Sequence, residues 1–188
     1  MAVGVPVGLL AGYAGGRTDT VIMRVTDVLL AFPYLLLAIV VVGALGPGLV
    51  NALLAVSISA IPFYVRLVRG QVVSIKKAEF VESARAMGAR TGRIVGRAIL
   101  PAVLPYLLVM FAANAGFILV QASALSFLGL GVQPPTPEWG SILAENRQYA
   151  TIAPYSVLLP GLCILIVVLG LNLLADALRD VLDVRADL

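Results

Sequence analysis

The side chains best suited to recognition lie in one charged stretch, residues 66–97, which separates two long apolar runs. Within this stretch, Glu79–Met87 contains good helix formers throughout. Phe80, Ala84 and Met87 recur at positions i, i+4 and i+7, so they would share one face of that helix. The pattern predicts a short amphipathic helix, whose chemistry is reversible binding to a protein groove or to a membrane surface. These residues alone favour neither partner.

The ends of the predicted helix carry charges and a glycine where they stabilise helix termini. Glu79 and Glu82 stand in the first turn, where the helix dipole favours anions, and Arg85 stands near the end. Gly88 follows the last turn, and glycine readily adopts the left-handed conformation that ends many helices. We therefore expect the helix to stop at Gly88.

The composition argues against a catalytic site. The chain has no histidine, so the usual general base and the commonest metal ligand are both absent. Its one cysteine, Cys163, lies in an apolar run and has no second cysteine to pair with. The phosphate-binding pattern Gly-x-x-x-x-Gly-Lys-Ser/Thr does not occur. We expect no catalysis, no metal and no bound cofactor, and any ATP used would be hydrolysed by a separate subunit.

Most of the chain is suited to a bilayer. Of its 188 residues, 61% are hydrophobic and 12% are charged, whereas soluble domains carry about 25% charged residues. A spanning helix needs about 20 mainly apolar residues. Four runs meet this requirement, and we expect spans over about 28–45, 49–70, 103–129 and 154–175. Residues 1–16 are apolar but short, so we expect them to be the end of a spanning helix that begins before this chain.

The basic residues predict the orientation of these spans. Of the 13 Lys and Arg residues, two lie at 17–24, eight at 66–97 and two at 179–185, and the four spans place these twelve on one side. The positive-inside rule assigns that side, and with it the C-terminus, to the cytoplasm. Arg147 lies in the opposite segment, 130–153. Because topology accounts for the basic residues, we expect no binding to nucleic acid.

The predicted spans contain no Asp, Glu, Lys or Arg. Ion-coupled transporters and proton pumps usually need such residues within the membrane, so a secondary transporter or channel is the weaker alternative. The polar side chains that remain are Asn51, Asn114, Gln121 and Asn172. Each suits either a hydrogen bond between helices or a substrate path. We select Asn114 and Gln121 as the candidates for a substrate path.

The charged stretch also carries a spaced motif. Glu82–Ala84 (Glu-Ser-Ala) is followed by three residues, Gly88, nine residues and Ala98–Pro101 (Ala-Ile-Leu-Pro). This arrangement resembles the signature loop of binding-protein-dependent ABC importer permeases, which reads Glu-Ala-Ala, three residues, Gly, nine residues and Ile-x-Leu-Pro. Ser83 replaces the first alanine and Ala98 replaces the isoleucine, and both changes keep the small or apolar character.

More of the chain resembles one branch of that family, the dipeptide, oligopeptide and nickel permeases, and most closely the second permease subunit of the peptide systems. The matching segments are Leu10–Gly16, Met23–Asp27, Ala31–Pro33, Arg66–Gly70, Leu125–Pro135, Glu138–Gly140 and Asn172–Asp180. The resemblance implies an all-α integral membrane protein with the type I ABC importer fold, in which residues 1–188 form a single permease domain. It also implies that residues 79–88 are a coupling helix that docks on an ATPase subunit.

The resemblance further implies the acting residues and partners. The docking residues would be Glu79, Phe80, Glu82, Ser83, Ala84, Arg85, Met87 and Gly88. The partners would be a second permease subunit, one or two cytoplasmic ATPase subunits and an extracytoplasmic solute-binding protein, for which the loop 131–153 with Trp139 would be part of the docking surface. The protein would be a multi-pass inner-membrane permease importing peptides or a related small solute such as nickel. A non-transporting membrane scaffold is the other alternative, although it would have no use for the signature spacing.

Overall fold

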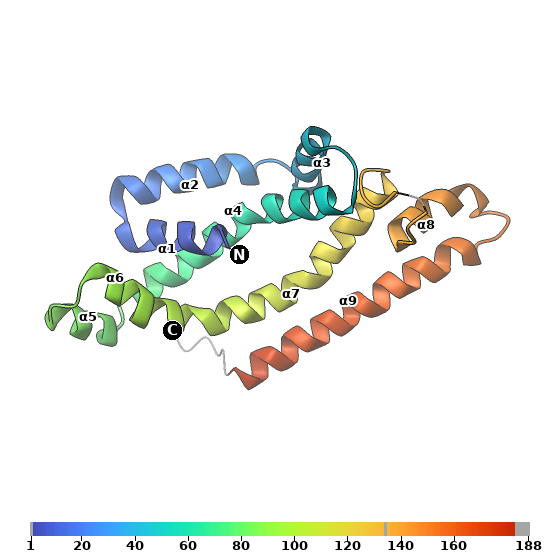
Figure 1. The fold of residues 1–188 in the computed structure, drawn as a ribbon. Helices are drawn as coiled ribbons and strands as arrows, with labels where there is room; N and C mark the ends of the chain where they lie inside the picture. Colours follow the sequence, from blue (N-terminus) through green and yellow to red (C-terminus); the bar gives the residue numbers. More distant parts are fainter. Residues whose placement is uncertain (1, 134, 183–188) are drawn as a thin grey trace. The chain divides into compact units, whose positions relative to one another are not determined.

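The structure, a computed structural model, describes residues 2–133 and 135–182, and the regular elements in these ranges are helices (Figure 1). The chain divides into two compact units. Unit 1 comprises Met1–Phe32, Ala60–Val109 and Arg179–Leu188, and unit 2 comprises Pro33–Ser59 and Met110–Leu178. The two long helices α4 (Leu49–Ile75) and α7 (Leu100–Phe127) contribute residues to both units.

Unit 1 contains the N-terminal helices, the short helices of the charged stretch and parts of both long helices. In chain order these are α1 (Gly4–Ala14), α2 (Gly16–Leu30), the second part of α4, α5 (Glu79–Ala86), α6 (Thr91–Ile94), a π-helical turn (Val95–Ile99) and the start of α7. Each of these elements except α2 supplies buried residues to one apolar cluster, the unit 1 core. Its buried members are Leu9, Val68, Val72, Ile75, Val81, Ile94, Ile99, Val103 and Leu107.

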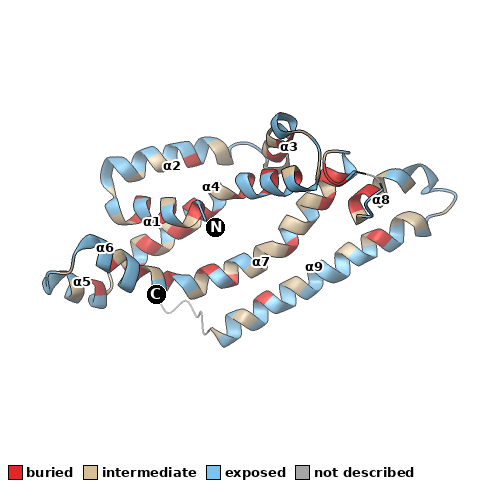
Figure 2. Cartoon of the chain, viewed as in Figure 1, coloured by how far each residue is buried: buried red, intermediate tan, exposed pale blue. Residues whose placement is uncertain are grey.

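Unit 2 contains α3 (Tyr34–Leu45), α8 (Trp139–Asn146), a 3-10 turn (Arg147–Tyr149), most of α9 (Tyr155–Val181) and the remaining parts of α4 and α7. Its core is small and is formed by α3, α4 and α7. The buried members are Ala38, Val42, Ala52, Ala55, Val56 and Leu125. The Tyr34 hydroxyl donates to the Val56 carbonyl at 2.6 Å, and its ring lies edge-on to Phe117. By contrast, α9 is exposed along most of its length (Figure 2), as expected for a helix whose apolar surface faces lipid.

Three of the four predicted spans are confirmed as long apolar helices. Within the described residues, Leu49–Ile75, Thr91–Phe127 and Tyr155–Val181 are long and apolar enough to cross a membrane. A fourth span results only if α2 and α3 cross the membrane together. The predicted short apolar segment at the start of the chain is the 11-residue helix α1.

The predicted continuous helix over 28–45 is wrong. Helix α2 ends at Leu30, α3 begins at Tyr34, and Pro33 between them has φ −55° and ψ 132°. Proline disfavours the helical conformation in the residue before it, so the chain breaks at Ala31–Phe32. Hydropathy alone does not register this break because all the residues around it are apolar.

Helix α1 packs closely on α4 within unit 1. Every fourth residue of α1 from Gly4 is a glycine, and a Cβ atom placed there would lie only 2.7–2.8 Å from a side-chain atom of α4. The facing pairs are Gly4 with Tyr64, Gly8 with Val68 and Gly12 with Val72. Small residues at this spacing let two helix backbones approach each other in membrane proteins.

Candidate functional site

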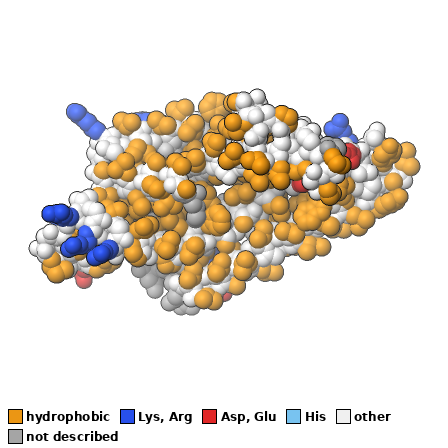
Figure 3. All heavy atoms as spheres, in the orientation of Figure 1, with side chains coloured by type: hydrophobic (Ala, Val, Ile, Leu, Met, Phe, Trp, Pro, Cys, Tyr) orange, Lys and Arg blue, Asp and Glu red, His pale blue; other side chains and the backbone are white. Residues whose placement is uncertain are grey.

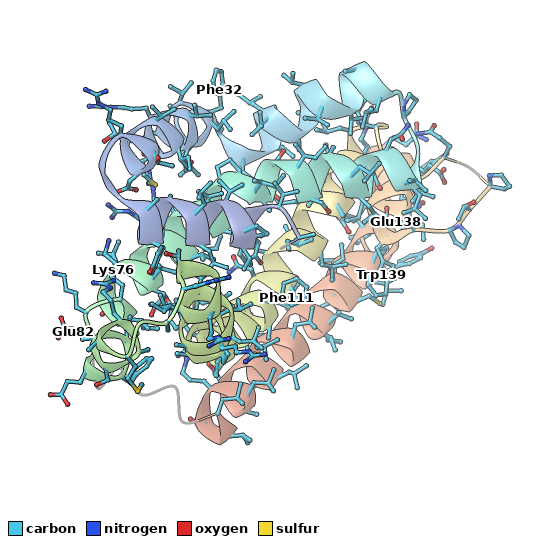
Figure 4. The ribbon with its side chains drawn as sticks, turned by 60° about the vertical axis from the view of Figure 1, so that its left-hand side comes forward. Phe32, Lys76, Glu82, Phe111, Glu138 and Trp139 are labelled. Carbon is cyan, nitrogen blue, oxygen red and sulfur yellow. The ribbon has the colours of Figure 1, made fainter. Side chains whose placement is uncertain are left out.

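The candidate site is built around α5, the short helix predicted in the charged stretch. It covers Glu79–Ala86, with both glutamates in its first turn and Arg85 in its last. Val81 is completely buried in the unit 1 core, and Ala84 is half-buried against the same cluster. The other predicted docking residues are exposed, and Glu82 projects away from the helix (Figure 4). The apolar contacts of Val81 and Ala84 therefore hold α5 on the core, and the other predicted docking residues remain accessible in the described structure.

The predicted apolar face of α5 is only partly correct. Phe80 and Met87 do lie on one side of the helix, but they are 49% and 81% exposed. Ala84 belongs to the inner side instead, together with Val81, which the sequence interpretation did not select. Helical spacing places Val81 and Ala84 three residues apart on a second apolar edge, and this signal was available in the sequence. The helix thus has an anchoring edge and a separate exposed edge.

Gly88 ends α5 as predicted, with φ of 77°. Its N–H donates to the Arg85 carbonyl at 2.9 Å, and the Ala89 N–H donates to the Ala84 carbonyl at 3.1 Å. These two bonds form a Schellman motif, which satisfies carbonyls that the helix end leaves free. A Cβ atom at position 88 would meet nothing within 4 Å, so glycine is required here by the backbone conformation rather than by space.

A π-helical turn joins the charged stretch to α7. Ile94 and Ile99 are five residues apart and are both buried in the unit 1 core. In an uninterrupted α-helix, a separation of five residues would turn their side chains about 140° apart. The wider turn over Val95–Ile99 brings the side chains of Ile94 and Ile99 to the same side of the helix. Val103 and Leu107, which follow at intervals of four residues, lie on that side as well. The π turn therefore lets α6 and α7 share the core that anchors α5.

A hydrogen bond from Lys76 joins the segment between α4 and α5 to helix α1. Lys76 lies between the end of α4 and α5, and its Nζ donates to the Gly12 carbonyl at 2.8 Å (Figure 4). That carbonyl is in the last turn of α1, where backbone acceptors lack helical partners and a cation is favourable. Because the contact joins residues 64 positions apart, no local pattern could have predicted it.

Two ion pairs join α2 to α4 on the same unit. Arg69 donates to both carboxylate oxygens of Asp19, at 3.0 and 2.6 Å. Arg66 pairs with Asp27. Both arginines belong to the basic stretch 66–97, so carboxylates within unit 1 neutralise part of the positive charge of that stretch. Around α5 and α6 the remaining basic side chains gather on the surface (Figure 3).

The two candidates for a substrate path both lie on α7 in unit 2, two turns apart. The Asn114 amide donates to the Met110 carbonyl of its own helix at 2.8 Å. The Gln121 Oε1 atom is buried and has no hydrogen-bond partner among the described residues. Neither side chain is among those that line the hollows on α2 and beside α8. Of the other two polar residues, Asn51 caps α3 by donating to the carbonyls of Leu45 and Gly46.

A second loop lies in unit 2, and the structure describes its residues 128–133 and 135–141. Glu138 precedes α8, and its carboxylate accepts hydrogen bonds from the Ser141 N–H and the Ser123 hydroxyl, both at 3.0 Å. A Cβ atom at Gly140 would lie 2.1 Å from the Ser123 carbonyl oxygen, so the start of α8 presses on α7. The sequence interpretation missed the role of Glu138, because its partner Ser123 is 15 residues away.

No metal site can be built from the described residues, since they contain no group of three or more His, Cys, Asp or Glu side chains placed to hold an ion. Cys163 is exposed on α9. The chemistry available at α5 is therefore binding, through exposed apolar and acidic side chains on an anchored helix.

Comparison with known proteins agrees with this picture of a membrane-embedded binding subunit. The family described as "Binding-protein-dependent transport system inner membrane component" matches residues 4–187. A dipeptide transport system permease protein of Alkalihalophilus pseudofirmus is 47% identical over 96% of this chain and 59% of its own length. Glutathione transport system permease proteins of Pectobacterium atrosepticum and Escherichia coli are 49% and 50% identical over 97% of this chain.

The chain spans about three-fifths of the length of these curated relatives, which are covered over 59–61%. The family match nevertheless takes in α1 to α9 and the signature loop, and it confirms the resemblance drawn from that loop. The chain belongs to the family of binding-protein-dependent transport system inner membrane components.

Proposed function

We propose that this chain is a permease subunit of an ATP-driven importer and that its spans form part of the path for small peptides. The family match and the two kinds of relative support this proposal, since their names refer to dipeptides and to glutathione, a tripeptide. A nickel complex or another small solute is the less supported alternative. The chain contains no phosphate-binding loop, so separate ATPase subunits would hydrolyse the ATP and this subunit would not be an enzyme.

In this proposal α5 is the coupling helix that docks on an ATPase. The observation that carries it is the division of α5 into a buried anchor, Val81, and an exposed edge with Phe80 and Met87. Exposed apolar side chains next to Glu79 and Glu82 suit a groove with apolar walls and basic residues. An eight-residue helix is marginal in water, so docking and the anchor would stabilise it together.

The unit 1 core is the route by which movement of α5 would reach the spans. Val81 packs in one cluster with Ile75 at the end of α4 and with Ile94 and Ile99 before α7. Closely packed interiors transmit displacement because they contain few voids. A displacement of α5 by a closing pair of ATPases would therefore move α4 and α7 together.

The proposed importer has further partners on both sides of the inner membrane. A second permease subunit, the same or different, would complete the path, with one or two ATPase subunits in the cytoplasm. An extracytoplasmic solute-binding protein would dock on the loop that contains Trp139 and α8. The signature spacing and the family match support an importer over a secondary transporter, channel or scaffold.

The proposed orientation places residues 66–97 and the C-terminus in the cytoplasm and residues 130–153 outside. Ser74 and Thr136 are both exposed, so each can be replaced by cysteine in a Cys163→Ser background. An impermeant thiol reagent added to intact cells should label position 136 and leave position 74 unlabelled. Labelling of position 74 alone would reverse the orientation.

The docking role is tested by reversing one exposed charge on α5. Glu82→Lys should reach the membrane at a normal level, yet capture less ATPase and lose substrate-stimulated ATP hydrolysis. Glu145→Lys is the matched control for ATPase capture alone, because Glu145 is also an exposed glutamate on a short helix but lies in the loop assigned to the other side, where the solute-binding protein would dock. If both variants capture the ATPase and transport normally, α5 does not dock through this surface.

A further inference from the structure

The outward surface of α2 is an apolar stripe. Val21, Val25, Val28 and Phe32 recur at positions i, i+4, i+7 and i+11, and they are 56–63% exposed. Hydrophobic side chains cover this part of the surface (Figure 3), and Phe32 at the end of the stripe points outward (Figure 4). On a membrane protein such a stripe is covered either by the acyl chains of the surrounding lipid or by another apolar segment.

The acidic and the basic side chains of α2 have different surroundings. Asp19 and Asp27 pair with Arg69 and Arg66 of α4, so both carboxylates of the helix are neutralised within unit 1. Arg17 and Arg24 are exposed, and within residues 2–133 and 135–182 neither has an ion-pair partner. Arg24 lies close to the apolar stripe around the helix. The outer side of α2 therefore offers two cations beside an apolar strip.

A hollow of about 270 Å³ on α2 combines these two properties. It is lined by Arg24, Val25, Val28 and Leu29, one cationic and three apolar side chains. The hollow of about 240 Å³ in unit 2 differs, because its lining of Val120, Ser123, Ala124, Phe127, Leu143 and Ile164 carries no charge. Of these two hollows, the one on α2 combines a cation with apolar side chains, which suits an amphiphile with an anionic head.

We propose that the outer side of α2 binds an anionic phospholipid of the surrounding membrane. The guanidinium of Arg24 receives the phosphate through charge-assisted hydrogen bonds, and an acyl chain covers Val25 and Val28. Arg17, two turns earlier, adds attraction to the same headgroup region. A helix with an apolar stripe flanked by arginines is suited to the boundary between headgroups and acyl chains. A protein partner would instead have to bring its own acidic residues to this face.

The test uses the assembled importer, with all subunits otherwise free of cysteine, in lipid nanodiscs. A fluorophore is attached at Val28→Cys in a Cys163→Ser background, and quenching is followed as brominated phosphatidylglycerol or brominated phosphatidylcholine replaces the host lipid. The proposal predicts that phosphatidylglycerol reaches half-quenching at a several-fold lower mole fraction. One basic side chain near an anionic surface corresponds to about a five-fold preference.

Two substitutions separate the charge from the apolar stripe. Arg24→Gln should bring the two quenching curves together, whereas Arg24→Lys should keep most of the preference. A label at Ile164→Cys, in the uncharged hollow of unit 2, should be quenched equally by the two lipids. Equal curves at position 28 in the parent protein would overturn the proposal, and so would the absence of quenching by either lipid, which would indicate a protein partner. None of these outcomes depends on transport or on ATPase docking.

Discussion

Two loops of the molecule can be compared, residues 76–90 in unit 1 and residues 128–141 in unit 2. In each loop a glycine ends a helix with the same backbone conformation, but the contacts that hold the two loops are of different kinds. Gly88 and Gly129 both have φ of 77°, and each is followed by a residue whose N–H reaches back five positions. The first loop is then fixed by the apolar side chain of Val81. The second is fixed by the carboxylate of Glu138, through hydrogen bonds to Ser123 and Ser141.

The difference separates a contact that tolerates movement from one that does not. Apolar burial is non-directional, so α5 can tilt about Val81, whereas a displacement of the whole helix still presses on the close-packed unit 1 core. Hydrogen bonds weaken steeply when their geometry is disturbed, so Glu138 holds α8 at one angle. The first arrangement suits an element that relays motion, and the second suits a fixed surface. Four tests of this contrast follow, in order of decreasing expected effect.

Val81→Asp should disrupt the packing of the first loop more than any of the other changes. An unpaired carboxylate in the unit 1 core would destabilise the local structure by about 3 kcal/mol or more, so α5 would leave its anchor. Transport and ATPase capture should both be lost, while the spans still insert. Membrane abundance and uptake in vesicles are the measurements. Val81→Ile, which keeps the anchor apolar, is the control, and full activity of Val81→Asp would disprove the anchoring role.

Insertion of an alanine after Gly96 should move α6 out of register with α7. Each added helical residue turns the chain by about 100°, so Ile94 would leave the core and lose about 2–3 kcal/mol of burial. Gly96→Ala, which keeps the residue count and meets no atom within 4 Å, should be nearly silent. Uptake and ATPase capture of the two variants should differ sharply. Equal activity would show that the register of α6 is irrelevant.

Glu138→Ala should loosen the second loop alone. The loss of an N-cap typically destabilises a helix by about 1–2 kcal/mol, so the amides of α8 should exchange hydrogen faster. Exchange in α5 should not change, because no described contact of Glu138 reaches unit 1. Glu145→Ala is the control for removing a carboxylate from the same helix. Unchanged hydrogen exchange in α8 would contradict the role of Glu138 in holding this helix.

Gly88→Ala and Gly129→Ala form a matched pair with the smallest effects. Each places a Cβ on a residue at φ 77° with open space around it, so each should destabilise its turn by about 1–2 kcal/mol. The functional outcomes should differ: position 88 should affect ATPase-coupled uptake, and position 129 should affect stimulation by the solute-binding protein. The same defect from both variants would remove the distinction between the loops.

Local patterns in the sequence predicted local structure well. The glycine at position 88, the glutamates of the first turn and the three long apolar helices were all readable because each depends on neighbouring residues. The break at Pro33 was also readable, but hydropathy outweighed the proline in predicting one helix over 28–45.

Contacts between distant residues were not predictable in the same way. Val81 shares a core with Leu9 and Leu107, and Glu138 meets Ser123, but no periodicity links such positions. The sequence indicated Lys76 only as one of the basic residues that set the membrane topology. In the structure its Nζ donates a hydrogen bond to the Gly12 carbonyl. Helical spacing could have marked Val81 as part of an apolar edge, but tertiary packing alone identifies its partners and those of Lys76 and Glu138.

The most direct test of the central claim is the accessibility of the exposed edge of α5 with and without the ATPase. Met87→Cys and Thr136→Cys, each in a Cys163→Ser background, are treated with a soluble thiol reagent in solubilised permease, and the modification rates are compared before and after ATPase is added. The docking proposal predicts that the rate at position 87 falls at least ten-fold, while the rate at position 136 is unchanged. An unchanged rate at position 87 in a complex shown to contain bound ATPase would contradict it.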